Sequence, residues 1–181
     1  MPSEGRDRPA LLAFFLPLTR KTCAELHVGN ETVARYLAEI LAEFARTDRL
    51  YRVRSLGGEP AASVVDMLSG EPDAGDRHFQ RYVGDFTLFM SGLFRPFVEA
   101  RGFLGYYLVE GARAYARASA LGEGRPRAET ALYCELAVRF EYYAGALDYL
   151  RKARFPGLVG PDPVGTFLRE VRHVVASLSR N

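Results

Sequence analysis

The feature that most constrains the fold is a helical spacing of apolar residues, which is cleanest in residues 31–44. There the apolar side chains follow one another at intervals of three and four residues. They are Val33, Tyr36, Leu37, Ile40, Leu41 and Phe44. An α-helix repeats about every 3.6 residues, so this spacing places them on one face of a helix. Asn30, directly before the segment, is a favourable N-cap.

The same spacing returns along most of the chain and predicts an all-α fold. We expect further helices at residues 19–27, 61–68, 76–98, 102–121, 127–151 and 164–178, separated by glycine- and proline-rich breaks. Residues 50–55 alternate apolar and polar side chains, which fits a short strand or an irregular connection. One isolated strand cannot form a sheet. The prediction is an irregular bundle of five to seven helices, with 76–98 and 127–151 as its central pair.

Length and composition indicate one soluble domain. A chain of 181 residues can bury about 70% of its unfolded surface without a metal or disulfide. We expect residues 1–9 to be a disordered N-terminal tail and residues 10–181 to form the domain. The apolar run 10–18 is too short to cross a membrane, and Thr19-Arg20-Lys21-Thr22 follows it instead of a cleavage site. These features favour a cytoplasmic protein.

The charge pattern argues against a nucleic-acid partner. The net charge is only +2, and all but two of the 24 basic residues are arginines spread over the whole chain. That usage favours codon bias in a GC-rich bacterial genome over a phosphate-binding site. In the helix 31–44 the outward face carries Glu31, Glu39 and Glu43 against Arg35, which would repel phosphate.

No motif indicates a metal or cofactor. The chain has no Walker A loop, dinucleotide-binding glycine fingerprint, His-Glu-x-x-His or Gly-x-Ser-x-Gly segment. Glu170 with His173, and Cys23 with His27, each offer two ligands at helical spacing. Two ligands do not make a metal site. We therefore expect neither a metal nor a cofactor.

Two carboxylates stand in apolar surroundings and are the candidates for chemistry. Asp85 lies within residues 82–90, and Glu110 lies within residues 106–111. A buried carboxylate must be paired, or its pKa rises. One interpretation is an acid, base or ligand anchor in a pocket, and the other is an ion pair that holds helices in register. The conceivable partners are Arg95, Arg101, Arg113 and Arg139.

Most of the tyrosines lie in the second half of the chain. They can line a ligand pocket, form an interface or fill a core. Together with Asp85 and Glu110, the candidate ligand-binding residues are Tyr106, Tyr107 and Tyr143.

Residues 84–94 read Gly-Asp-Phe-Thr-Leu-Phe-Met-Ser-Gly-Leu-Phe. This segment resembles the Gly-Asp-x-x-Leu-Phe-x-x-Gly-x-Phe pattern of a group of uncharacterised bacterial helical proteins. Residues 36–44 and 105–107 look similar as well, so the likeness covers about the middle half of the chain. Many such proteins continue with Phe-Pro, whereas this chain has Phe94-Arg95-Pro96. The resemblance implies a bacterial, helical protein and brings no activity.

The sequence leaves two principal functional hypotheses. The first is a non-enzymatic helical interaction module that self-associates, as a homodimer, or binds another protein through an apolar helix face. It loses its basis if the aromatic residues are buried within one chain. The alternative is a pocket protein or enzyme that uses Asp85, Glu110 and nearby tyrosines on a small molecule. A metal protein using Glu170, His173, Cys23 and His27 is the weakest hypothesis.

Overall fold

Apolar stripes and capping residues produce a fold made of helices. The computed structural model describes residues 7–46, 75–122 and 124–178, and these ranges contain eight helices and no strand. In chain order they are α1 (Asp7–Glu25), α2 (Glu31–Phe44), α5 (Arg77–Leu93), α6 (Arg95–Ala100), α7 (Leu104–Ala120), α8 (Arg127–Val138), α9 (Phe140–Arg154) and α10 (Pro163–Leu178). The all-α prediction is confirmed, although five to seven helices was too few. The segments predicted at 50–55 and 61–68 lie outside the described residues.

Side-chain caps set the first residue of several helices. The Oδ1 atom of Asn30 accepts a hydrogen bond from the Val33 N–H at 3.3 Å and begins α2, as predicted. Asp76 does the same for α5 through the His78 N–H at 2.8 Å. Each cap satisfies one of the N–H groups that have no partner within the helix.

Both long helices predicted for the centre of the bundle are broken in two. The first breaks at Phe94 (φ −113°, ψ 28°), and Pro96 then stands in the first turn of α6, where a missing N–H does no harm. The second breaks at Arg139 (φ −117°, ψ 28°) with no proline or glycine to mark it. Phe140, the next residue, is buried against the ring of Tyr115.

Helix α1 is longer than the sequence pattern indicated. It begins at Asp7, so residues 7–9 belong to the helix rather than to the predicted tail, and Pro17 lies within it. Residues at four-residue spacing face the interior, among them Leu11, Phe15 and Cys23. In the run 10–18, apolar residues also occupy the other faces of α1. The buried face of this helix therefore cannot be recognised from the spacing of apolar residues. No helix in the described part of the chain is long and apolar enough to cross a membrane.

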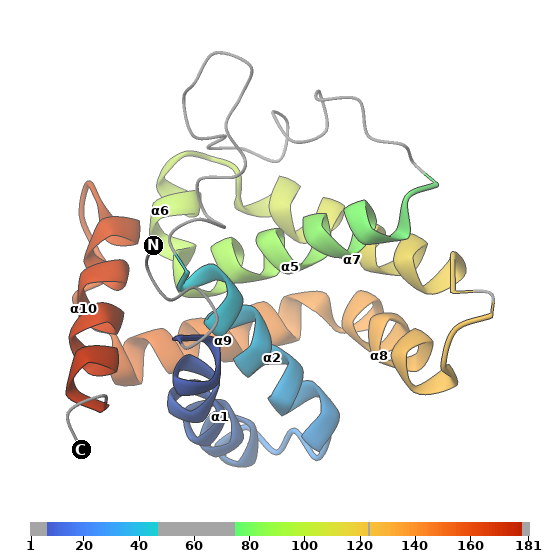
Figure 1. Cartoon of the computed structure of the whole chain (residues 1–181). Helices are drawn as coiled ribbons and strands as arrows, with labels where there is room; N and C mark the ends of the chain where they lie inside the picture. The colour runs from blue at the N-terminus through green and yellow to red at the C-terminus, as the bar shows by residue number, and fades with distance from the viewer. Residues whose placement is uncertain (1–6, 47–74, 123, 179–181) are drawn as a thin grey trace.

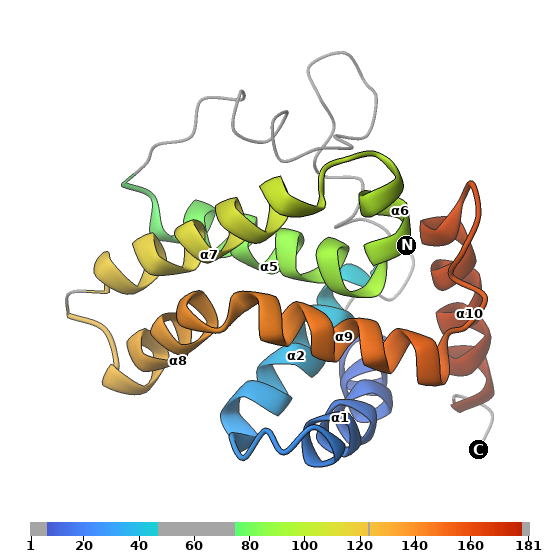
Figure 2. The same ribbon diagram turned by 180° about the vertical axis from the view of Figure 1, so that it is seen from behind.

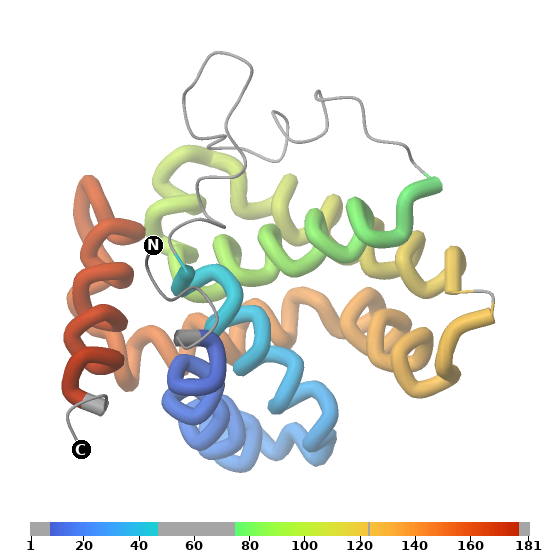
Figure 3. Tube along the Cα trace, in the orientation of Figure 1, coloured from blue at the N-terminus to red at the C-terminus, as the bar shows by residue number. Residues whose placement is uncertain are grey.

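Helix α5 lies in the middle of the arrangement. It packs most extensively against α7 and α9, and α8 continues from α7 toward α9 (Figure 1). Seen from behind, α7 and α9 both lie in front of α5, with α9 below α7 (Figure 2). Helices α1 and α2 lie side by side as a pair, and α10 stands across the end of the bundle (Figure 3). Of the predicted central pair, α5 is central and α9, the second part of the predicted helix 127–151, packs against it, but α7 packs against α5 more extensively.

Glycines on α5 allow its neighbours to approach closely. A Cβ atom on Gly84 would lie 2.8 Å from the ring of Tyr115 on α7. A Cβ atom on Gly92 would lie 2.5 Å from the Cβ atom of Leu147 on α9. Real Cβ atoms do not approach other atoms so closely, so both helix contacts require glycine.

Gly92→Ala is expected to lower the free energy of unfolding by about 1–3 kcal/mol, because the added methyl group must push α9 away. Gly145→Ala is the matched control, since nothing lies within 4 Å of the added Cβ atom in the interior of α9. We expect it to raise stability by about 0.5–1 kcal/mol. Urea unfolding of both variants measures the difference, and equal effects would contradict close packing at Gly92.

Candidate functional site

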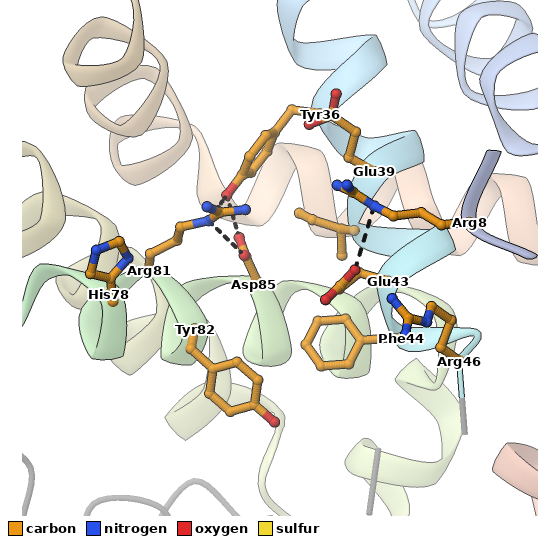
Figure 4. Close-up of a pocket in the computed structure, with 11 residues that line it drawn as sticks. Arg8, Tyr36, Glu39, Glu43, Phe44, Arg46, His78, Arg81, Tyr82 and Asp85 are labelled. Atoms are coloured by element: carbon orange, nitrogen blue, oxygen red, sulfur yellow. Dashed lines mark hydrogen bonds and ion pairs between the residues drawn. The ribbon is translucent and has the colours of Figure 1, made fainter. Parts of the chain in front are cut away.

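The carboxylate of Asp85 is the meeting point of three helices. Its Oδ1 atom accepts a hydrogen bond from the Tyr36 hydroxyl of α2 at 2.6 Å and from the Tyr115 hydroxyl of α7 at 2.7 Å. Its Oδ2 atom accepts from the Nε–H of Arg81, one turn earlier on α5, at 3.3 Å. Figure 4 shows Tyr36 and Arg81 converging on this carboxylate. Asp85 is thus buried and fully paired, as a charged group in a protein interior must be.

Each donor reaches Asp85 for a local reason. Gly84 precedes Asp85, and its missing side chain leaves room for the Tyr115 ring against the α5 backbone. Tyr36 belongs to the buried stripe of α2, so its hydroxyl points toward the bundle. Arg81 is four residues before Asp85, the spacing at which side chains on a helix meet.

Tyr133 of α8 completes an aromatic frame around the two phenols. Its ring centre lies 6.0 Å from that of Tyr36, edge to face, and 5.9 Å from that of Tyr115, stacked. The Tyr133 hydroxyl donates to Glu129 at 3.1 Å, and the Arg77 guanidinium lies 5.0 Å from the Tyr133 ring centre. Such ring contacts fix the positions of both hydroxyl groups that Asp85 needs.

Burial dominates the electrostatics of the network. Removal from water raises the pKa of Asp85, against the opposing influence of the Arg81 guanidinium and the two tyrosine hydroxyls. Burial and the neighbouring Asp85 carboxylate hold the pKa values of Tyr36 and Tyr115 well above their ordinary value. Both phenols therefore stay protonated and remain hydrogen-bond donors at neutral pH.

A hollow of about 390 Å³ opens beside this network, between α2 and α5. It is lined by Arg8, Tyr36, Glu39, Ile40, Glu43, Phe44, Arg46, His78, Arg81, Tyr82 and Asp85 (Figure 4). Its carboxylates are matched by arginines: Arg8 lies 3.7 Å from Glu43, and Arg35 lies 3.2 Å from Glu39. Counted over the lining residues themselves, three arginines (Arg8, Arg46 and Arg81) balance three carboxylates (Glu39, Glu43 and Asp85).

A second, more open hollow of about 270 Å³ lies between α2, α5 and α8. It is lined by Thr32, Tyr36, Glu39, Arg81, Ala128, Glu129, Leu132 and Tyr133. Tyr36, Glu39 and Arg81 line both hollows, so these three side chains form the partition between them.

Of the five predicted ligand-binding residues, Asp85 is the one that lines either hollow. Glu110 pairs with Arg113 on its own helix, α7. Tyr106 is 38% exposed on that helix, Tyr107 is buried with its ring 6.3 Å from that of Phe86, and the Tyr143 hydroxyl donates to Glu135. Glu110 therefore shares neither of these two hollows with Asp85.

The partners of Asp85 differ from those that the sequence pattern predicted. Tyr36 was counted only as one member of the apolar stripe of α2, and Tyr115 was one of many tyrosines. Arg81 is the arginine that binds Asp85, and none of the four arginines considered as partners does so. The i,i+4 spacing of Arg81 and Asp85 was the signal that could have identified it.

The predicted metal-binding alternatives gain no further ligands. Among the described residues no group of three or more His, Cys, Asp or Glu side chains is placed to hold a metal ion. Burial and the nearby Glu31 raise the pKa of the Cys23 thiol to about 11, which disfavours the thiolate that binds metals. His27, with φ 57°, ends the turn after α1.

No protein-family model matches this chain, and no curated protein or solved structure is significantly similar to it. What the protein does must therefore be inferred from the chemistry of its own residues.

Tyr115→Phe is expected to lower the free energy of unfolding by about 1.5–3 kcal/mol, because it removes a buried hydrogen bond to a charged group. Tyr106→Phe is the matched control on the same helix, since this exposed hydroxyl has no partner in the described structure. We expect that control to change stability by less than about 0.5 kcal/mol. Urea unfolding measures both, and equal effects would argue against a structural hydroxyl at Tyr115.

Asp85 should also make stability depend on pH. Its folded-state pKa is raised, so the folded state holds more protons than the unfolded state between about pH 4 and the raised value. The stabilisation that Asp85 provides is therefore complete below about pH 4 and declines as pH rises through that window. The difference in unfolding free energy between the wild type and Asp85→Asn should shrink with rising pH. A difference that grows with pH would mean that Arg81 and the hydroxyls lower the pKa instead.

Proposed function

We propose that the protein binds a small organic molecule in the hollow between α2 and α5. One observation carries this proposal: a buried carboxylate, Asp85, forms part of the wall of a hollow of about 390 Å³. Ligand pockets typically occupy about 300–1,000 Å³ and combine apolar walls with a few fixed polar groups. Tyr36 and Arg81 supply such groups beside Asp85, and Ile40 and Phe44 supply apolar wall.

The three donors to Asp85 differ in their exposure to the hollow. Tyr36 and Arg81 line it, whereas Tyr115 does not and binds Asp85 from α7. A purely structural network would have no need to present two of its donors to a hollow. This difference in exposure supports a site in which Tyr115 positions the carboxylate, while Tyr36 and Arg81 contact a ligand.

The lining of the hollow favours binding over covalent catalysis. Among the described residues that line it there is no serine, threonine, cysteine or lysine, and the carboxylates, which are also potential nucleophiles, are each paired with an arginine. Its fixed, hydrogen-bonded groups are suited to orienting a molecule.

Native mass spectrometry tests the proposal. Untagged protein is incubated with a cell extract filtered to retain only small molecules, desalted and sprayed intact. We expect a reproducible added mass on the wild-type chain. Tyr36→Phe removes a donor that lines the hollow, so it should weaken retention while the chain stays folded by circular dichroism.

Tyr106→Phe provides the control, because Tyr106 lies outside both hollows and should retain the added mass. Equal retention by the Tyr36 and Tyr106 variants would contradict a site between α2 and α5. A bare wild-type mass after incubation would also count against the proposal.

Self-association in the cytoplasm, as a homodimer, is the second candidate. Most apolar residues of α5 are buried within this chain, so the support comes from exposed apolar side chains elsewhere: Val138 of α8, Tyr142 and Tyr149 of α9, and a group at the start of α7. There Phe103, Tyr106 and Val109 are 38%, 38% and 54% exposed at three-residue spacing, which places the latter two on one helix face. Sedimentation of wild type and Val109→Asp tests it: a dimer that the charge dissociates supports this candidate, and a wild-type monomer refutes it.

A further inference from the structure

Among the described residues, the hydrogen bonds of the Arg81 side chain come from its Nε–H group. The Nε–H lies 3.2 Å from the Tyr36 hydroxyl and 3.3 Å from the Oδ2 atom of Asp85. The guanidinium carbon lies 5.8 Å from the centre of the Tyr36 ring, within reach of a cation–π contact. These contacts fix the base of the guanidinium and leave its outer edge uncommitted.

The two terminal nitrogens of Arg81 form that outer edge. Within the described part of the chain they donate to no protein group, although a guanidinium carries four N–H groups on these two atoms. The Arg81 side chain is 42% exposed and lines both hollows. A fixed guanidinium with an open planar edge has the geometry that binds a carboxylate or phosphate at two points.

The remaining charges of the larger hollow favour a ligand with a single negative charge. Glu39 and Glu43 are each paired with an arginine, so they do not cancel the open edge of Arg81. The hollow as a whole is lined by three arginines and three carboxylates, so it offers no surplus of positive charge for a multiply charged anion. A carboxylate carries one charge at neutral pH, whereas a phosphate monoester carries nearly two.

We propose that the ligand of this site is a small organic carboxylate whose carboxylate group binds the terminal nitrogens of Arg81. The rest of the molecule lies in the larger hollow against Tyr36, Ile40 and Phe44, which supply its apolar wall. This inference rests on the proposed function and adds the chemical class of the ligand.

Four probes with one aromatic ring and different head groups test it: benzoate, phenyl phosphate, benzylamine and benzyl alcohol. Each is titrated into the ¹⁵N-labelled full-length protein while the arginine Nε–Hε signals are followed by NMR. The Arg81 signal is assigned by its loss in Arg81→Lys. We expect benzoate to bind most tightly of the four and to shift the Arg81 signal.

Matched arginine variants separate the role of Arg81 from general charge. Arg81→Lys keeps the charge but loses the planar edge, and Arg81→Gln loses both, so benzoate should bind each about tenfold or more weakly. Arg113→Gln removes an arginine that also pairs with a carboxylate on its own helix but lies outside both hollows, and benzoate binding should not change. Circular dichroism verifies that each variant is folded. If Arg81→Gln unfolds, benzoate binding by Arg81→Lys alone tests the role of the Arg81 guanidinium.

The other outcomes overturn the inference in distinguishable ways. Tighter binding of phenyl phosphate, or benzoate binding that survives in Arg81→Lys, would refute a carboxylate on Arg81. Tighter binding of benzylamine or benzyl alcohol that shifts the Tyr36 ring signals would refute the carboxylate but leave the proposed function standing. If no probe binds and the wild-type chain retains no small molecule from the extract, both proposals fail.

Discussion

The carboxylate of Asp85 is the interaction on which the arrangement of the bundle depends. A carboxyl group in an apolar interior is tolerated only when its hydrogen bonds are satisfied, and three donors from α2, α5 and α7 satisfy this one. Helix α2 is far from α5 and α7 in the sequence, so these hydrogen bonds fix its position against the other two. The same requirement explains why the phenols of Tyr36 and Tyr115 must stay protonated.

Close packing makes this network possible. Gly84 admits the Tyr115 ring to the backbone of α5, and Tyr133 stacks on that ring from α8. The exclusion of water that follows raises the pKa of Asp85, while the hydrogen bonds keep the carboxylate oriented. On its open side, the same carboxylate holds Tyr36 and Arg81 at the border of two hollows. One buried group thus serves both the fold and the candidate site.

Much of the fold could be predicted from local patterns, because amphipathic spacing and caps such as Asn30 act within a few residues. The break at Arg139 could not, since no proline or glycine marks it and the burial of Phe140 depends on a distant helix. Asp85 stood out because a carboxylate among apolar residues needs a partner. Its partner Tyr36 is 49 residues away, and an aromatic residue in a stripe looks the same whether it packs or donates a hydrogen bond.

We propose that the polar wall formed by Asp85, Tyr36 and Arg81 contacts a bound small molecule. A crystal structure of the protein soaked with the small-molecule extract tests this most directly. We expect additional electron density between α2 and α5, within hydrogen-bonding distance of the terminal nitrogens of Arg81 or of the Tyr36 hydroxyl. Density confined to another surface, such as the outer face of α7, with only water between α2 and α5, would contradict it.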